Sequence, residues 1–319
     1  MERHLESTPE HLERLLVATS RTFALAIPLL PEPTRKEVTI AYLLFRIADT
    51  FEDAAAWPRG LRIGALERFA GLLERPDRAE IREVARRWAE EVPCEQPGYQ
   101  ELLAEMPRVF DELLGLSPAA VELIRAHTLR TTRGMAEFVN RIDEHGELLL
   151  ENLADLRQYC YVVAGIVGEL LTELFLLEQP SLEPVSAALR ERSRPFGEAL
   201  QLVNILKDSA SDATEGRRYL PEGVDRAEVL ALARGDLKTA IDYVLTLQRA
   251  GAARGIVAFG ALPVQLAHAT LDRVETAGPG SKLSRPEVYG ILHRLQTALD
   301  RDEPAIITSS DPESVRAWG

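Results

Sequence analysis

The sequence has few cysteines and lacks the signatures of several large protein classes. Only Cys94 and Cys160 occur in 319 residues, and neither lies in a C-x-x-C or zinc-like cluster. This excludes a disulfide framework and indicates a reducing compartment, so we expect a cytoplasmic protein. The first residues lack the basic start and apolar run of a signal peptide. No G-x-G-x-x-G fingerprint or βαβ pattern is present, which excludes a Rossmann site.

Aromatic residues are also scarce, at 6% of the chain, and basic residues are outnumbered by acidic ones. The chain has 37 Lys and Arg against 50 Asp and Glu, a formal net charge of −13. Such an acidic surface argues against a nucleic-acid partner, because a binder must neutralise phosphates. The most apolar stretch, 159–177, is interrupted by Glu169 and Glu173, and we expect a buried core helix there rather than a membrane span. Peripheral contact with a membrane stays open.

Helical periodicity is what the sequence has in abundance. Apolar residues recur at spacings of three and four, and no long strand-like alternation or Gly/Ser linker interrupts them. We therefore predict an all-α fold with a single domain over residues 1–301, followed by a polar tail over residues 302–319. Ser117 is expected to cap a helix whose first residue is Pro118. The predicted helices are 8–29, 34–55, 60–74, 77–92, 98–114, 118–141, 153–178, 186–213, 225–233, 236–254, 259–276 and 284–300.

The first chemical motif is the acidic segment 46–53. Asp49, Glu52 and Asp53 follow at i, i+3 and i+4, so three carboxylates share one helical face, with Arg46 beside them. Like charges at this spacing destabilise a helix, and a divalent cation would offset the repulsion. Mg²⁺ prefers carboxylate oxygens and shares its remaining positions with substrate phosphates. The alternative is a solvated acidic face at a helix end.

The second motif is a polar stripe in the segment 201–212. Gln201, Asn204, Asp208 and Asp212 are spaced by three, four and four residues, and apolar residues flank them. A polar line on an otherwise apolar helix predicts burial against a polar cavity, because buried amides and carboxylates need partners. The alternative is an amphipathic helix whose stripe faces water.

Together the two segments predict a magnesium–diphosphate site. Carboxylates on two helices can face each other across a bundle and hold cations that help a diphosphate depart. The expected metal ligands are Asp49, Glu52, Asp53, Asn204, Asp208 and Asp212, and the four aspartates are the expected catalytic carboxylates. Guanidinium and ammonium groups would complete a phosphate clamp. The candidates for that clamp are Arg21, Arg46, Lys207, Arg217 and Arg218.

Four blocks in a fixed order resemble the squalene and phytoene synthases, the head-to-head prenyl transferases. The blocks are 20–23, 42–53, 134–138 with 159–168, and 204–221, and they span most of the chain. The central block is more similar to squalene synthases than to phytoene synthases. The resemblance implies an isoprenoid-synthase-type helical bundle around a central apolar cavity.

The resemblance also implies roles for particular residues. Tyr159 matches the family's catalytic tyrosine, although without the family it would pass for a core residue with a satisfied hydroxyl. The implied contacts to prenyl diphosphate substrates come from Ser20, Arg21, Tyr42, Arg46, Gln201, Asn204, Arg217 and Arg218. Lys207 departs from the arginine of many relatives, keeping the charge and losing the bidentate fork.

The implied activity is a Mg²⁺-dependent condensation of two farnesyl diphosphates through presqualene diphosphate, then reduction by NADPH to squalene. The segment 278–285 resembles the mobile region near the family's cofactor site, so Lys207, Lys282 and Arg285 are expected to meet NADPH. The alternative for this segment is a solvated loop. The enzyme could also stop at presqualene diphosphate, or make dehydrosqualene or phytoene without hydride. A non-catalytic helical binding or assembly protein is the alternative from another class.

Overall fold

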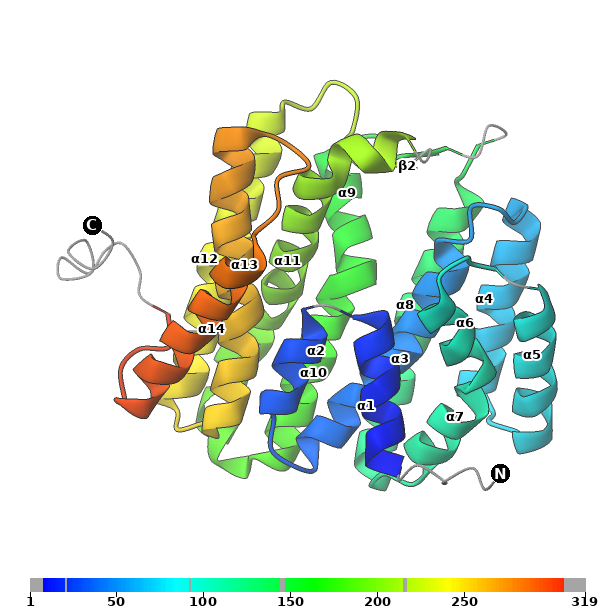
Figure 1. Cartoon of the computed structure of the whole chain (residues 1–319), viewed down its shortest axis with the longest axis horizontal. Coiled ribbons are helices and arrows are strands. Elements are labelled where there is room, and N and C mark those ends of the chain that lie inside the picture. The colour runs from blue at the N-terminus through cyan, green and yellow to red at the C-terminus, as the bar shows by residue number, and fades with distance from the viewer. Residues whose placement is uncertain (1–7, 21, 92, 144–146, 215–216, 307–319) are drawn as a thin grey trace.

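Helices form nearly all of the chain that the structure describes (Figure 1). The structure is a computed structural model and describes residues 8–306 except 21, 92, 144–146 and 215–216; the side chains of residues 8, 9, 212–214 and 217 are outside that description. The α-helices are α1 Thr8–Thr19, α2 Phe23–Ala26, α3 Thr34–Glu52, α4 Arg59–Glu74, α5 Arg78–Glu91, α6 Pro97–Ala104, α7 Met106–Leu114, α8 Pro118–Asn140, α9 Leu153–Cys160, α10 Ile166–Glu178, α11 Ser186–Thr214, α12 Arg226–Arg249, α13 Arg254–Ala277 and α14 Arg285–Asp300. The predicted all-α class is confirmed.

Short elements join these helices. Two of them are 3₁₀ helices, η1 Ile27–Leu29 and η3 Pro180–Val185, and the π-helix η2 Tyr161–Gly165 lies between α9 and α10. The strands β1 Leu148–Leu149 and β2 Arg217–Arg218 pair in parallel. The strand pair ties the segment after α8 to the segment after α11.

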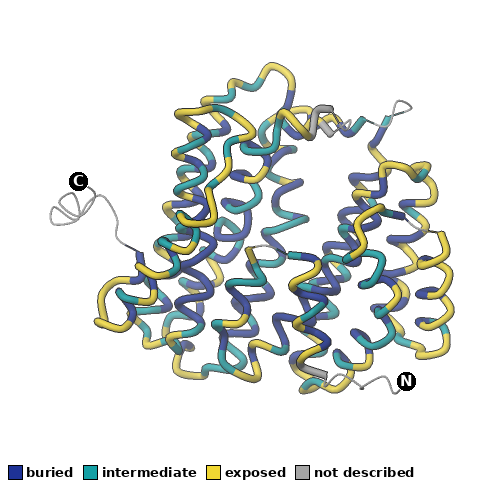
Figure 2. The backbone as a smooth tube through the Cα atoms, in the orientation of Figure 1, coloured by how far each residue is buried: buried dark blue, intermediate teal, exposed yellow. Residues whose placement is uncertain are grey.

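The helices pack in a bundle with a continuous apolar core. Helices α4 to α7 lie at one end and α12 to α14 at the other (Figure 1). Between them, α8 packs against α3 and α4, while α11 packs against α10, α12 and α13. Buried residues follow the inner faces of the helices and exposed residues follow the outer turns (Figure 2). This is the pattern that the 3.6-residue periodicity predicts.

Several predicted helix boundaries hold, and others are wrong. Ser117 caps α8 by accepting a hydrogen bond from the amide of Ala120 at 3.2 Å, as expected. The prediction of a single helix over 8–29 is wrong. The Ser20 hydroxyl accepts a hydrogen bond from the amide of Phe23 at 3.0 Å, and a new helix starts there. The helix expected over 98–114 is split before Pro107, which has no amide hydrogen to continue α6.

Helix α12 corrects a third boundary. The segments 225–233 and 236–254 were expected as separate helices, but α12 runs through Gly235 without a break. A glycine inside a helix costs only about 1 kcal/mol. The continuous helix places Arg234 against Asp272 and Glu275 of α13, at 2.5 and 2.6 Å.

The apolar stretch near the middle of the chain is a core helix with a π-turn in it. Residues Leu153–Glu178 are long and apolar enough to cross a membrane by length and composition, yet 56% of their most apolar window is buried inside the protein. They pack against α8 and α11.

Packing continues beyond α14. The side chain of Gln248 on α12 bonds the carbonyl of Glu303 and the amide of Ala305, both at 2.8 Å. Ala305 and Ile306 are buried. The first residues of the segment expected as a polar tail are therefore attached to the helical domain.

Candidate active site

The acidic motif lies at the carboxyl end of α3. The helix ends at Glu52, and the backbone N–H of Asp53 caps it by donating to the Asp49 carbonyl at 2.8 Å. The Asp49 side chain keeps 23% of its exposure. Burial raises the pKa of Asp49 to about 6, Arg46 opposes that rise, and the neighbouring Asp53 adds to it. This carboxylate is desolvated and still reachable from solvent, which suits a ligand-binding group.

Arg46 is held in place by two groups. It donates to the Asp49 carboxylate at 2.6 Å and to the hydroxyl of Tyr99, and its guanidinium lies over the Tyr99 ring at 4.9 Å. Among the described residues no partner meets its Nε. Sequence reasoning missed Tyr99, because it lies on α6 with no motif around it.

Glu52 and Tyr159 meet inside the protein. The Tyr159 hydroxyl donates to the Glu52 carboxylate at 3.0 Å, and both side chains are buried. Burial, Asp53 and Asp49 all raise the pKa of Glu52. Burial, followed by the charge of Glu52, raises the pKa of Tyr159 well above its usual value. The phenol therefore keeps its proton near neutral pH.

Aromatic rings surround Tyr159. Tyr219 stacks on it with ring centres 4.8 Å apart, and Phe138 meets it edge-on at 5.1 Å. Tyr219 follows β2, so the segment after α11 reaches the tyrosine that contacts α3. Tyr219 belongs to the predicted 204–221 block, but no role was assigned to it from the sequence.

The second motif lies on α11 and is more exposed than expected. The Lys207 ammonium meets the Asn204 side-chain oxygen at 3.3 Å and the Asp208 carboxylate at 3.1 Å. Asn204 is exposed, which corrects the expectation of a buried stripe, while Gln201 and Asp208 are half-buried. The flanking residues Leu202, Val203, Ile205 and Leu206 are buried.

Three predicted residues fall outside what is described. Arg21 is one of the residues without a description, and the side chains of Asp212 and Arg217 are not described. Within the described residues, no group of three or more His, Cys, Asp or Glu side chains is arranged to hold a metal ion. The proposed metal set depends in part on Asp212.

The remaining substrate-binding candidates lie near the start of the chain and on β2. The hydroxyl of Tyr42 donates to the Thr19 carbonyl at 2.9 Å, next to Ser20. Burial raises the pKa of Tyr42. Arg218, on β2, lies 3.8 Å from Glu147 and 3.7 Å from Glu222.

The loop before α14 lies against α11. The amide of Gly280 donates to the carbonyl of Lys207 at 2.7 Å, and Arg273 holds the carbonyl of Lys282 at 2.9 Å. The fold thus brings Lys282 near the second motif. Arg285 is exposed at the start of α14.

Two glycines of the central block serve helix packing. A Cβ on Gly168 would lie 2.1 Å from the Ser193 carbonyl oxygen of α11. One on Gly165 would lie 2.8 Å from the Tyr161 ring. At both positions the space that a side chain would need is filled by this chain itself.

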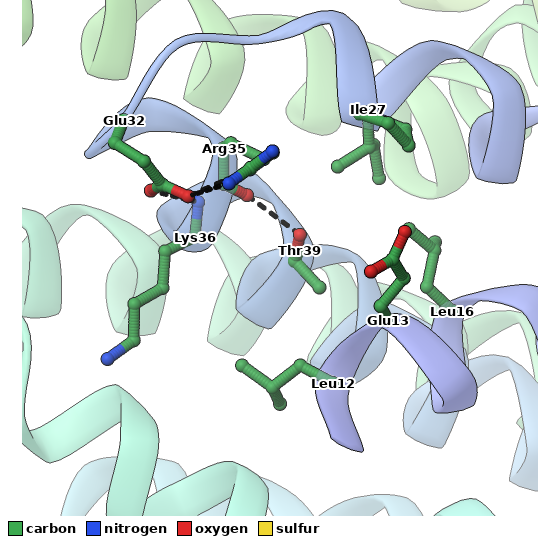
Figure 3. Close-up of a pocket in the computed structure, with 9 residues that line it drawn as sticks. Leu12, Glu13, Leu16, Ile27, Glu32, Arg35, Lys36 and Thr39 are labelled. Carbon is green, nitrogen blue, oxygen red and sulfur yellow. Dashed lines mark hydrogen bonds and ion pairs between the residues drawn. The ribbon is translucent and has the colours of Figure 1, made fainter. Parts of the chain in front are cut away.

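A pocket of about 200 Å³ lies elsewhere, between α1, η1 and α3 (Figure 3). Its lining combines apolar residues such as Leu12, Leu16 and Ile27 with the charged residues Glu13, Glu32, Arg35 and Lys36. None of the predicted site residues lines it.

Two solved structures share this fold over nearly the whole chain. The chain matches TcSQS in complex with a ligand at a TM-score of 0.68 and 24% identity, over 96% of this chain and 94% of that one. A dehydrosqualene synthase in complex with a ligand matches at a TM-score of 0.57 and 20% identity, over 92% and 97%. At these identities the likeness establishes the fold, which is the squalene synthase type of helical bundle.

Sequence comparison gives the family. The squalene/phytoene synthase family model matches residues 16–288. Squalene synthase of Schizosaccharomyces pombe is 32% identical over 227 residues, 69% of this chain and 46% of that protein. Squalene synthase LSS of Botryococcus braunii is 33% identical over 203 residues, 63% and 39%. The matches span less than half of these relatives' length. The chain belongs to the squalene/phytoene synthase family, as its blocks predicted.

Proposed function

We propose that the protein condenses two farnesyl diphosphates head to head into presqualene diphosphate and reduces this with NADPH to squalene. The contact that carries the proposal joins Tyr159 and Glu52 at 3.0 Å. It places a buried phenol directly beside the carboxylate motif of α3, within a chain of this family. The similarity to named squalene synthases supports the choice of substrate and product.

The carboxylates fit a divalent cation. Asp53 raises the pKa of Asp49 and of Glu52, and Asp49 also raises that of Glu52; Arg46 opposes the rise at Asp49 and Arg62 opposes it at Glu52. Mg²⁺ stabilises carboxylates that are crowded together in this way. Asp49, Asp53, Asn204 and Asp208, with Asp212, would hold it. When bound, Mg²⁺ neutralises the charge on a departing diphosphate.

Glu52 has a different environment from the two aspartates. Its carboxylate accepts the Tyr159 hydroxyl and is only 8% exposed. Within the proposed site it orients Tyr159, and we assign it this role in place of the metal-ligand role expected from the sequence. The stacked rings of Tyr159 and Tyr219 offer electron-rich faces that favour a carbocation.

Arg46 is the described guanidinium best placed for the diphosphate. Asp49 and Tyr99 fix its orientation, which lowers the entropy lost when a phosphate binds. The other proposed substrate contacts come from Ser20, Arg21, Tyr42, Gln201, Arg217 and Arg218.

The reductive step rests on the loop beside α11. The Gly280–Lys207 bond brings Lys282 near the second motif, and Arg285 follows on α14. Three cationic side chains in this region, including Lys207, suit the phosphates of NADPH. The product would be a hydrocarbon that partitions out of water, which favours peripheral membrane contact of a cytoplasmic enzyme.

One incubation tests the proposal. The protein is given farnesyl or geranylgeranyl diphosphate with Mg²⁺, with and without NADPH, and the products are extracted. We expect squalene from farnesyl diphosphate only when NADPH is present. Presqualene diphosphate or dehydrosqualene in both cases would remove the reductive step, phytoene from the longer substrate would overturn the substrate, and no turnover would favour a binding protein.

A further inference from the structure

The helix that carries Tyr159 contains a π-turn directly after it. In η2 the amide of Ile166 donates to the carbonyl of Tyr161, five residues back instead of four. Such a turn inserts one extra residue, and π-turns inside α-helices are frequent at functional sites. One residue corresponds to about 100° of helix rotation. The turn therefore sets which face of α9 points at α3.

With that rotation Tyr159 meets its partners on three other segments. It contacts Glu52 on α3, Phe138 on α8 and Tyr219 after β2. On the other side of the turn, Leu170 and Leu174 of α10 are buried in the core. If the turn relaxed to a regular α-helix, Tyr159 and the core face of α10 could not both keep their partners.

The π-turn is fixed from α8 by a hydroxyl. Thr131 donates from Oγ1 to the carbonyl of Val162 at 3.0 Å, and Thr131 is fully buried. Gly134, one turn further along α8, lets the helix approach, because a Cβ there would lie 2.6 Å from Val162 Cγ1. From the opposite side α11 presses on the same turn, since a Cβ on Gly197 would lie 2.0 Å from the Ala164 carbonyl oxygen.

We propose that Thr131 is a positioning residue for the reaction, which holds the π-turn so that Tyr159 faces Glu52. The inference rests on the proposed function and assigns Thr131 no contact with substrate. Its hydroxyl satisfies a carbonyl within the π-turn, and a buried carbonyl without a partner drives the backbone toward another arrangement.

The chain supplies a matched control on the same helix. Thr132 is also fully buried, but its hydroxyl donates to the Thr128 carbonyl within α8 at 2.8 Å. Thr131→Val and Thr132→Val remove the same hydroxyl from adjacent positions, and only the first acts on η2. Thr131→Ser keeps the hydroxyl and serves as the rescue variant.

The test measures Mg²⁺-dependent diphosphate release from farnesyl diphosphate. We expect Thr131→Val to lower kcat about tenfold with KM changed less than about twofold, Thr131→Ser to recover most of kcat, and Thr132→Val to match wild type. Because Thr131 acts through Tyr159, Thr131→Val should add little in a Tyr159→Phe background. Equal kcat for the two valine variants, or full additivity with Tyr159→Phe, overturns the inference.

A crystal structure of Thr131→Val separates this inference from the proposed function. The Tyr159–Glu52 distance should exceed about 3.5 Å, beyond a hydrogen bond, whatever the activity. An unchanged distance overturns the inference even in an active enzyme. A wild type that releases no diphosphate overturns the proposed function and leaves the geometric prediction to be decided by the distance.

Discussion

The hydroxyl of Tyr159 lies 3.0 Å from the carboxylate of Glu52, although 107 residues separate them in the chain. The bond joins the central block of the sequence to its first acidic motif. Both groups are desolvated, so water does not replace either partner in this hydrogen bond. The predictions below start from this contact.

Removing the hydroxyl of Tyr159 should lower the reaction rate far more than it lowers the stability of the fold. Tyr159→Phe is expected to lower kcat for diphosphate release about tenfold or more, because the hydroxyl lies at the carboxylate motif. The matched control is Tyr243→Phe, since Tyr243 is fully buried and its hydroxyl meets Thr172 at 2.8 Å. Both variants should lose about 1 kcal/mol of unfolding free energy. An equal loss of kcat in both would contradict the role of Tyr159.

The planar fork of Arg46 should matter as well as its charge. Arg46→Lys keeps a cation but cannot hold Asp49 and Tyr99 together while facing a phosphate. We expect kcat/KM for farnesyl diphosphate to fall about tenfold or more. Arg35→Lys, at an exposed pair with Glu32, is the control and should keep wild-type kinetics. Wild-type kcat/KM in Arg46→Lys would argue against its phosphate role.

Stability should fall as pH rises because of Glu37. This α3 residue is 2% exposed, its Oε2 has no partner among the described residues, and burial raises its pKa from 4.5 to about 7, with Glu178 and Glu32 adding to the rise. The folded state binds the proton more tightly than the unfolded state. The stabilisation is therefore complete below pH 4.5 and is lost as pH rises through 7, a change of about 3 kcal/mol.

Glu37→Gln removes that titration. Urea unfolding at pH 5 and pH 8 should show a smaller pH-dependent loss in the variant than in wild type, and higher stability of the variant at pH 8. Glu91→Gln, at an exposed pair with Arg87, should keep the wild-type dependence. A wild type and a Glu37→Gln variant with the same pH dependence would refute the assignment.

A partly buried ion cluster around Glu198 supports the helix that bears Tyr159. Glu198 is fully buried and binds Arg157 of α9 at 3.1 Å and Arg194 at 2.5 Å. Glu198→Gln should cost about 2 kcal/mol, because Arg194 loses its carboxylate partner and Arg157 is left with Asp236 at 3.7 Å. Glu173→Gln, at a more exposed pair with Arg190, should cost about 0.5 kcal/mol. Chemical denaturation measures both, and equal losses would contradict the difference in burial.

The sequence was sufficient for the features that depend on local periodicity. Apolar spacing predicted most helices, and Ser117 was recognisable as a cap because capping chemistry is local. The breaks at Ser20 and Pro107 were also encoded locally, but a periodic apolar pattern continues across both. The continuous helix α12 depends on contacts with α13, which a local sequence pattern does not predict.

The site was predictable only as far as its motifs extend. Asp49, Glu52 and Tyr159 could be selected from the sequence, but their relative placement depends on how α3 and α9 pack. Tyr99 and Thr131 carry no motif and act through distant partners. The π-turn was not predictable, because residues 161–165 have the same apolar composition as the helix around them.

The central claim is that the two acidic segments act together on a diphosphate. The most direct measurement is diphosphate release from farnesyl diphosphate with Mg²⁺, compared between wild type, Asp208→Ala and the exposed control Asp242→Ala. We predict release that a chelator stops, that Asp208→Ala abolishes and that Asp242→Ala retains. Release that is absent from wild type, or unchanged in Asp208→Ala, would contradict the account.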